Sequence, residues 1–289
     1  MEFVDVKCPL GSDICGFDEK VVEQVGLEFP QAYTYAEGIA KIAAVVREQE
    51  HGAVCMIPFC HTVEAENYGG DIELGNARIG PRCNMPIYSS AEDLLRLPEL
   101  DFGKGRLGEV IKSISILKAK GESVGVEICG PITTLNNLID IAKLFKIWRK
   151  EPEIITVTME KMRLELLKYI EKALDAGVDF IAFEDPVGGF NILGPKYFEQ
   201  QGRNFSYPFV QAALKLIDGR CVMHLCPKTT SQLVSLGFAQ WDEFDLPEEM
   251  TYAKVCLELR GKIKLVGNIC IHNRNRLLAN KKMKSLKLL

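Results

Sequence analysis

Short runs of apolar and β-branched residues alternate with longer stretches of helical periodicity along most of the chain. The short runs predict strands, at Phe3–Cys8, Ala53–Phe59, Val124–Cys129, Phe180–Glu184, Val222–Cys226, Ala239–Phe244 and Ile263–Ile269. The longer stretches predict amphipathic helices, at Tyr35–Glu50, Leu107–Lys120, Thr133–Trp148, Ile154–Ala176, Phe209–Ile217 and Glu248–Arg260. This alternation predicts parallel strands joined by right-handed helical crossovers.

Two α/β architectures fit this pattern, a doubly wound open sheet and a (β/α)8 barrel. A dinucleotide-binding open sheet carries a Gly-x-Gly-x-x-Gly turn after its first strand, and the spacing of Gly11 and Gly16 does not make one. The segment 64–102 interrupts the alternation and contains Gly and Pro turns, which is typical of the long loops on the catalytic rim of a barrel. We therefore predict a single (β/α)8, TIM-type barrel domain over residues 1–289.

Composition and charge exclude some classes of partner. The formal net charge of −4 argues against nucleic acid and anionic membranes as partners. The first residues lack the pattern of a signal peptide, and no apolar run has the roughly 20 residues that a membrane span needs. The ten cysteines are scattered through the chain, which favours free thiols in a reducing environment over disulfides. These features predict a cytoplasmic protein.

The motif His224-Leu225-Cys226 ends one of the predicted strands. Residues two apart on a strand point to the same face, so both side chains are expected at the carboxyl-terminal mouth of the barrel. An imidazole and a thiolate there would supply half of a tetrahedral zinc site. The alternative is a buried cysteine beside a hydrogen-bonded histidine.

Carboxylates end a second predicted strand, at Glu184 and Asp185. At the mouth of a barrel they could orient a substrate or exchange protons with it, and the alternative is an Asp-Pro turn at Asp185 and Pro186. A third polar segment, 60–66, contains a cysteine, a histidine and two glutamates directly after a strand. It is either a ligand-binding loop or an ordinary polar rim, and neighbouring Cys60 and His61 cannot share one face of a strand.

The order and spacing of these motifs resemble the uroporphyrinogen decarboxylase superfamily, and within it the cobamide-dependent methyltransferases. The resemblance covers roughly residues 3–269. It is carried by short matching stretches at Pro30-Gln31-Ala32-Tyr33, Ile57-Pro58-Phe59, Thr62-Val63-Glu64-Ala65-Glu66, Gly80-Pro81, Leu95 to Leu97-Pro98, Gly130-Pro131, Phe183-Glu184-Asp185-Pro186, His224-Leu225-Cys226 and Gly267-Asn268.

The resemblance implies a zinc-dependent methyltransferase that works with a corrinoid protein and a small thiol or methylated substrate. His224 and Cys226 would hold the zinc, Asp245 could complete its shell, and Glu184 or Asp185 would serve the substrate. Decarboxylases of this superfamily carry an arginine-rich loop after the first strand, whereas segment 8–13 here has no arginine. The alternatives are a decarboxylase and a non-catalytic, incomplete barrel that only binds a corrinoid protein.

The end of the chain departs from the family pattern. The third zinc ligand of these methyltransferases is a cysteine near the end of the eighth strand, and this chain ends 21 residues after Asn268. The eighth βα unit is therefore expected to be absent, with Cys270 as a possible stand-in ligand. Residues 272–289 contain six Lys/Arg and no acid. They predict one weak amphipathic helix, with apolar positions at Leu277, Leu278, Met283 and Leu286, that could not pair with an exposed edge of the barrel.

Overall fold

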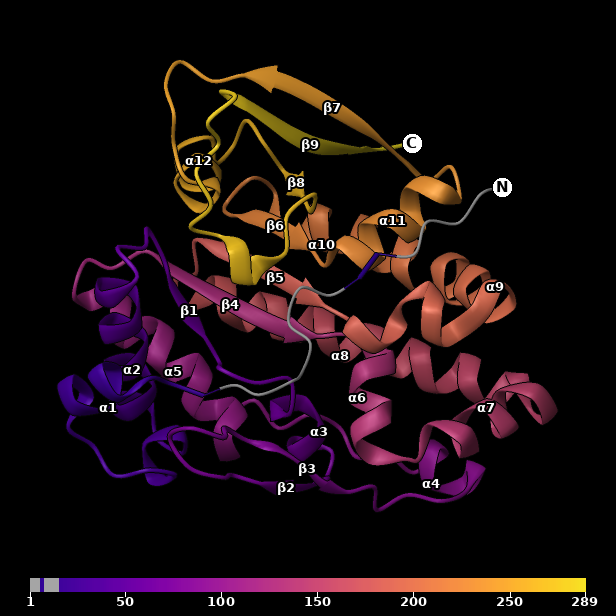
Figure 1. The fold of residues 1–289 in the computed structure, drawn as a ribbon. Coiled ribbons are helices and arrows are strands. Elements are labelled where there is room, and N and C mark those ends of the chain that lie inside the picture. The colour runs from indigo at the N-terminus through magenta and orange to yellow at the C-terminus, as the bar shows by residue number, and fades with distance from the viewer. Residues whose placement is uncertain (1–5, 8–15) are drawn as a thin grey trace.

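The computed structural model describes residues 6–7 and 16–289 and has a central parallel β-sheet flanked by helices (Figure 1). Five strands form this sheet in the order β1-β4-β5-β6-β8. Their bounds are Cys55–Ile57, Val124–Cys129, Phe180–Glu184, Val222–Leu225 and Leu265–Val266. All four pairings are parallel, as the alternation predicts. The strand predicted at Phe3–Cys8 lies almost entirely outside the described residues.

Helices connect the strands and cover the outer face of the sheet. They are α1 (Glu19–Val25), α2 (Ala36–Gln49), α3 (Val63–Asn67), α4 (Ala91–Leu95), α5 (Gly105–Ala119), α6 (Pro131–Leu138), α7 (Ile141–Lys150), α8 (Pro152–Asp175), α9 (Phe190–Gln201), α10 (Tyr207–Ile217), α11 (Pro227–Ser235) and α12 (Tyr252–Glu258). The interrupting segment holds α3, α4 and a two-stranded ribbon of β2 (Asp71–Glu73) and β3 (Arg82–Met85).

One predicted helix is in fact two. The segment 133–148 divides into α6 and α7 because Ile139 adopts an extended conformation and Asp140 begins a new helix. The Asp140 carboxylate accepts hydrogen bonds from the backbone N–H groups of Ala142 and Lys143, at 3.0 and 3.1 Å. An Asp in this position satisfies the free donors of a helix start.

Side chains alternate between the two faces of the sheet. In β5 and β6, Ile181, Phe183, Met223 and Leu225 belong to the large core shared with the helices. The intervening Phe180, Ala182 and Val222 belong to a second core, together with residues of α12 and of the segment after β8. This second core fills the inner face of the sheet.

The predicted barrel strand Ala239–Phe244 does form, as β7 (Ala239–Asp245), but it lies outside the central sheet. It pairs antiparallel with β9 (Lys282–Leu288), so the prediction of a helix in the tail is wrong. The register sets Lys282 opposite Asp245 and Lys284 opposite Glu243. Lys282 Nζ also lies 2.8 Å from Glu243 Oε1. The basic tail thus pairs with an acidic strand, and opposite charges across a ladder favour that pairing.

A short segment after β8 reaches both sides of the central sheet. At one side the carbonyl of Ile269 lies 2.8 Å from the ring of His224 in β6. At the other side Arg274 and Asn275 bind the carboxylate of Glu50, which follows α2 and precedes β1, at 2.5 and 2.9 Å. This segment, which includes the 3₁₀ turn η4 (Ile271–Asn273), therefore links β6 and β8 at one end of the strand order to the residues before β1 at the other end.

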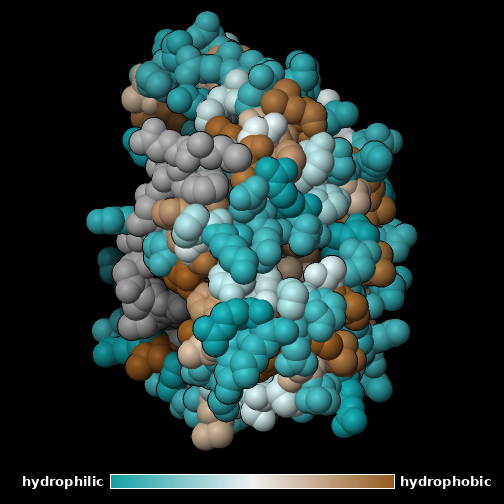
Figure 2. All heavy atoms as spheres, turned by 90° about the vertical axis from the view of Figure 1, so that its right-hand side faces the viewer, coloured by the Kyte–Doolittle hydropathy of each residue, from teal (hydrophilic) through white to brown (hydrophobic). Residues whose placement is uncertain are grey.

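On the surface shown in Figure 2, hydrophobic residues are scattered among hydrophilic ones. In the described part of the chain, no helix combines the length and the apolar character that a membrane crossing requires.

We expect Met283→Ala to lower the free energy of unfolding by about 2–4 kcal/mol, as buried Met→Ala changes do. Met283 in β9 is 1% exposed and packs in the second core. The matched control is Leu277→Ala in the same tail, where the side chain is 50% exposed and the cost should stay within about 0.5 kcal/mol. Urea unfolding measures both, and equal losses would show that β9 does not cover the core.

Candidate active site at the mouth of the barrel

Polar side chains gather where the parallel strands end. Glu127 lies in β4, Glu184 ends β5, His224 lies in β6, and Cys226 follows β6 as the first residue of the turn into α11. All four are buried. Because the carboxyl ends of parallel strands meet at one edge, this arrangement puts ionisable groups together in an interior that is otherwise apolar.

His224 and Glu184 form the centre of this group. His224 Nδ1 lies 3.0 Å from Glu184 Oε1, and both side chains are almost completely buried. His224 Nε2 lies 2.8 Å from the carbonyl of Ile269. A carbonyl can only accept, so Nε2 carries a proton and, in the neutral ring, Nδ1 keeps its lone pair. Neither Nδ1 nor Oε1 has an aligned hydrogen bond. Each of these two buried atoms therefore has a lone pair with which it could bind a metal ion.

Cys226 adds a thiol next to this pair. Burial raises the pKa of Cys226 well above its ordinary value, and electrostatic interactions with Glu184 and Cys270 raise it further. The thiol is therefore neutral unless a cation lies beside it. The structure brings Cys226, Cys270 and Glu184 into one neighbourhood, and a metal site shared by His224 and Cys226 stays a prediction.

Asp245 is not brought to His224 and Cys226. It lies at the end of β7, where it is solvent-exposed and opposite Lys282 in β9. The sequence placed it near the mouth because β7 was expected in the central sheet, and β7 is not part of that sheet.

Asp185 supports the site through α6. Its carboxylate accepts hydrogen bonds from the backbone N–H and the hydroxyl of Thr133, at 2.8 and 2.7 Å. Burial raises the pKa of Asp185 to about 6, because its effect is larger than that of the hydrogen bonds from Thr133, which lower the pKa. A Cβ atom on Gly130 would come within 2.4 Å of the Asp185 side chain, so this close approach requires glycine. These contacts are those of a helix-capping carboxylate, and a direct role for Asp185 on a substrate stays a prediction.

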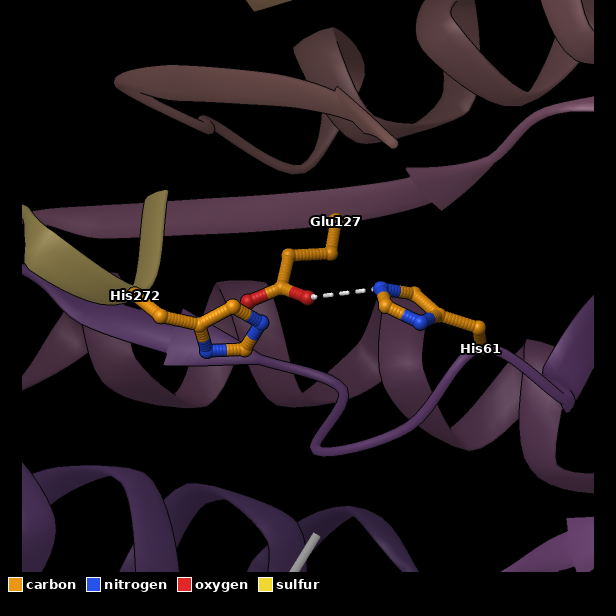
Figure 3. Close-up of side chains that lie close together, drawn as sticks. All are labelled: His61, Glu127 and His272. Carbon is orange, nitrogen blue, oxygen red and sulfur yellow. Dashed lines mark ion pairs between the residues drawn. The ribbon is translucent and has the colours of Figure 1, made fainter. Parts of the chain in front are cut away.

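A second group of ionisable side chains comprises His61, Glu127 and His272 (Figure 3). His61 follows β1, and His272 belongs to η4 in the tail. Burial alone would lower the pKa of His61, but its contact with Glu127 outweighs burial and raises the pKa to about 9. Burial alone would raise the pKa of Glu127, whereas His61 and His272 lower it overall.

The sequence reasoning included His61 in a polar segment and missed Glu127 and His272. The signal for Glu127 was a single acidic residue inside the strand Val124–Cys129, whose other residues are apolar or small. A buried charge in such a strand is retained only when partners stabilise it. No local signal marks His272, because its partners lie at least 145 residues away in the sequence.

A neighbouring network holds the loop after β1 in place. Glu64 in α3 accepts a hydrogen bond from the backbone N–H of Cys129 at 2.8 Å, and burial raises the Glu64 pKa to about 7. Buried Arg106 in α5 donates to the Thr62 hydroxyl at 2.8 Å and contacts the Cys60 sulfur at 3.3 Å. The polar segment 60–66 is thus tied to α5 and β4.

The profile of the family described as uroporphyrinogen decarboxylase (URO-D) matches residues 17–273, which is most of the chain. The chain belongs to the uroporphyrinogen decarboxylase family. Its fold is accordingly of the (β/α)8-barrel type, in agreement with the sequence prediction.

Within the uroporphyrinogen decarboxylase family, the chain is similar to proteins named methylcobamide:CoM methyltransferases. The one named MtaA from Methanosarcina barkeri (strain Fusaro) is 25% identical over 260 residues, which cover 86% of this chain and 74% of the relative. The one named MtbA from Methanosarcina mazei is 26% identical over 226 residues, covering 76% and 66%. A protein named uroporphyrinogen decarboxylase, from Serratia proteamaculans, is 27% identical over 173 residues, covering 57% and 46%.

Among solved structures, a methyltransferase from Methanosarcina mazei superposes on the chain with a TM-score of 0.64. The sequence identity is 23%, and the superposition covers 82% of this chain and 70% of the other. At this identity the likeness shows the shared fold of the two family members.

Proposed function

We propose that this member of the family is a zinc-dependent methyltransferase that moves a methyl group between a corrinoid protein and a small thiol or other small methylated molecule. Relatives named methylcobamide:CoM methyltransferases support this activity, because they match more than three quarters of the chain. The proposal includes a corrinoid protein as partner and a reducing, cytoplasmic environment.

The hydrogen bonding of His224 is the observation that carries the zinc proposal. Donation from Nε2 to the Ile269 carbonyl at 2.8 Å leaves Nδ1 as the free ligand atom, and metal-binding histidines commonly donate their other N–H to a backbone carbonyl in this way. Glu184 Oε1, which also lacks an aligned hydrogen bond, faces the same nitrogen. An imidazole, a carboxylate and the neighbouring thiols of Cys226 and Cys270 form a donor set that suits zinc.

Zinc in such a site acts as a Lewis acid that lowers the pKa of a bound thiol and so provides a nucleophile at neutral pH. The chain's own residues contribute position and environment. The Ile269 carbonyl orients the His224 ring, and the buried Glu184 carboxylate offsets positive charge beside it. Asp185 holds the start of α6 against the end of β5.

A porphyrinogen decarboxylase is the main alternative, and the charge of the mouth disfavours it. A tetrapyrrole with several carboxylates needs cationic side chains to bind it. The buried acids that end or line β4 and β5 here are Glu127, Glu184 and Asp185, while Arg106 is already engaged by Thr62 and Cys60. The arginine-free segment 8–13, which first suggested this choice, lies outside the described residues.

Absorption spectroscopy of a corrinoid protein tests the proposal. With a methylated corrinoid protein and a thiol, addition of this chain should convert the methyl-Co(III) spectrum to that of Co(I). In the opposite direction, a small O- or N-methyl donor should methylate Co(I). Uroporphyrinogen supplied in a parallel reaction should stay intact, and its decarboxylation would overturn the assignment. Failure of every methyl transfer with a folded, zinc-loaded protein would favour a non-catalytic, binding role.

A further inference from the structure

We propose that His61, Glu127 and His272 form a second metal site, separate from His224 and Cys226, which takes a divalent transition metal. The three residues come from the loop after β1, from β4 and from the C-terminal segment (Figure 3). One ligand atom of each lies within 4.8 Å of those of the other two. Among the described residues, this is the group of three or more His, Cys, Asp or Glu side chains whose ligand atoms lie this close together.

The distances suit ligands of one ion better than a hydrogen-bonded pair. His61 Nε2 lies 3.6 Å from Glu127 Oε2, which is too long for a normal N–H···O hydrogen bond. Two donor atoms bound at about 2.1 Å to a tetrahedral ion lie about 3.4 Å apart. The carboxylate of Glu127 extends between the two imidazole rings, so all three groups converge on a common volume.

His61 provides an independent indication of a missing ligand. Its Nε2 atom is buried and has no hydrogen-bond partner, although buried polar atoms almost always have one. Glu127 is 7% exposed and carries its charge inside the barrel. A divalent cation bound between them would satisfy the buried His61 nitrogen and the buried Glu127 carboxylate at once.

The chemistry of the donor set indicates the class of ion. Two imidazoles and one carboxylate occur as ligands of zinc and of non-haem iron, and leave coordination positions open for water or a substrate. Hard ions such as Mg²⁺ and Ca²⁺ prefer oxygen ligands and are disfavoured here. The expected ion is therefore Zn²⁺, Co²⁺ or Fe²⁺, at an open site near the mouth of the barrel.

Such a site would also attach the tail to the barrel. His272 lies in η4, and two residues later Arg274 binds Glu50 at the start of the segment that leads into β1. The metal would add a bond between η4 and β4 to this contact. Binding of the ion should therefore raise the temperature of unfolding, because the ion binds the folded state.

Cobalt distinguishes the two sites, because only thiolate ligands give an intense sulfur-to-cobalt charge-transfer band. The test uses tag-free Cys226→Ser/Cys270→Ser protein, dialysed against a chelator and titrated with Co²⁺. We expect one Co²⁺ per chain with weak visible bands and no thiolate band. His272→Asn in this background should weaken binding at least about tenfold, since even loss of a residue that only supports a ligand costs 10–100-fold.

The control is His51→Asn, which removes an exposed imidazole at a residue with a positive φ of 49° that Asn tolerates. It should leave Co²⁺ binding unchanged. His61→Asn provides a second test, which keeps the result interpretable if one variant fails to fold. Absence of Co²⁺ binding in the Cys226→Ser/Cys270→Ser background, or equal binding after both histidine changes, would overturn the proposal. Either result would leave the His224–Cys226 site untouched.

Discussion

The double variant His224→Ala/Cys226→Ala should lose one zinc per chain and at least about 10³-fold in methyl-transfer rate. A metal's Lewis acidity is worth several kcal/mol, and about 4 kcal/mol corresponds to a factor of about 10³. Zinc is measured by elemental analysis, and the rate is measured from the corrinoid spectrum. With Co²⁺ in place of zinc, the thiolate band should weaken strongly, because Cys270 alone is left of the thiols at this site.

The matched control for this variant is Cys221→Ala. Cys221 is buried directly before β6 and has a pKa raised to about 12, mainly by burial, but it lies at the opposite end of the strand from Cys226. Its loss should cost stability and leave zinc and methyl transfer intact. A thiolate band of unchanged intensity in the double variant would show that the metal binds another thiol, such as that of Cys270, without His224 and Cys226, and would overturn their assignment as ligands.

Asp185→Ala should destabilise the fold by about 2–4 kcal/mol, because several buried neutral donors lose their acceptor and each unsatisfied group costs about 1–3 kcal/mol. The buried carboxylate accepts two hydrogen bonds from Thr133, and Gln201 Nε2 lies 3.4 Å from it. The substitution leaves these donors without an acceptor in an interior that water does not reach. Urea unfolding gives the change in free energy.

Asp140→Ala is the control for this change, because Asp140 also begins a helix but is exposed. An exposed cap is worth about 1 kcal/mol, so the two alanine variants should differ clearly. Asp185→Asn keeps one acceptor oxygen and should cost less than Asp185→Ala. If Asp185→Ala were no more costly than Asp140→Ala, Asp185 would not organise α6, and its role would have to be sought at the substrate.

Local pattern was enough to predict most elements of this chain. The strands at β4, β5 and β6 were predicted within one residue, because each is a short, mostly apolar run of the kind that a strand buried on both faces requires. The inward placement of His224 followed from strand periodicity alone. The helices were predicted from the same kind of periodicity, and one boundary, at Asp140, was missed although Asp is a common first residue of a helix.

Partner choice was not predictable from local pattern. The run 239–244 has the composition of a strand, but nothing in it says whether its neighbour lies in the central sheet or in the tail. The tail contains no β-branched run, and its apolar positions predicted a weak amphipathic helix. In the structure Lys282 and Lys284 lie opposite Asp245 and Glu243 of β7, so the strand depends on a partner about 40 residues away rather than on its own propensity.

For the candidate site, too, the residues could be predicted from the sequence but their contacts could not. The motif His224-Leu225-Cys226 and the acids Glu184 and Asp185 were evident in the sequence, since each ends a predicted strand and the strands of a barrel converge at that end. Their contacts were not: the Ile269 carbonyl on His224, the cap that Asp185 provides to α6 and the exposure of Asp245 depend on how distant segments pack. In the group of His61, Glu127 and His272, the first and the last residue lie 211 positions apart in the sequence. Periodicity therefore determined which residues face inward, whereas only the tertiary packing decided which of them meet, because contacts between distant segments depend on the whole fold and leave no local pattern.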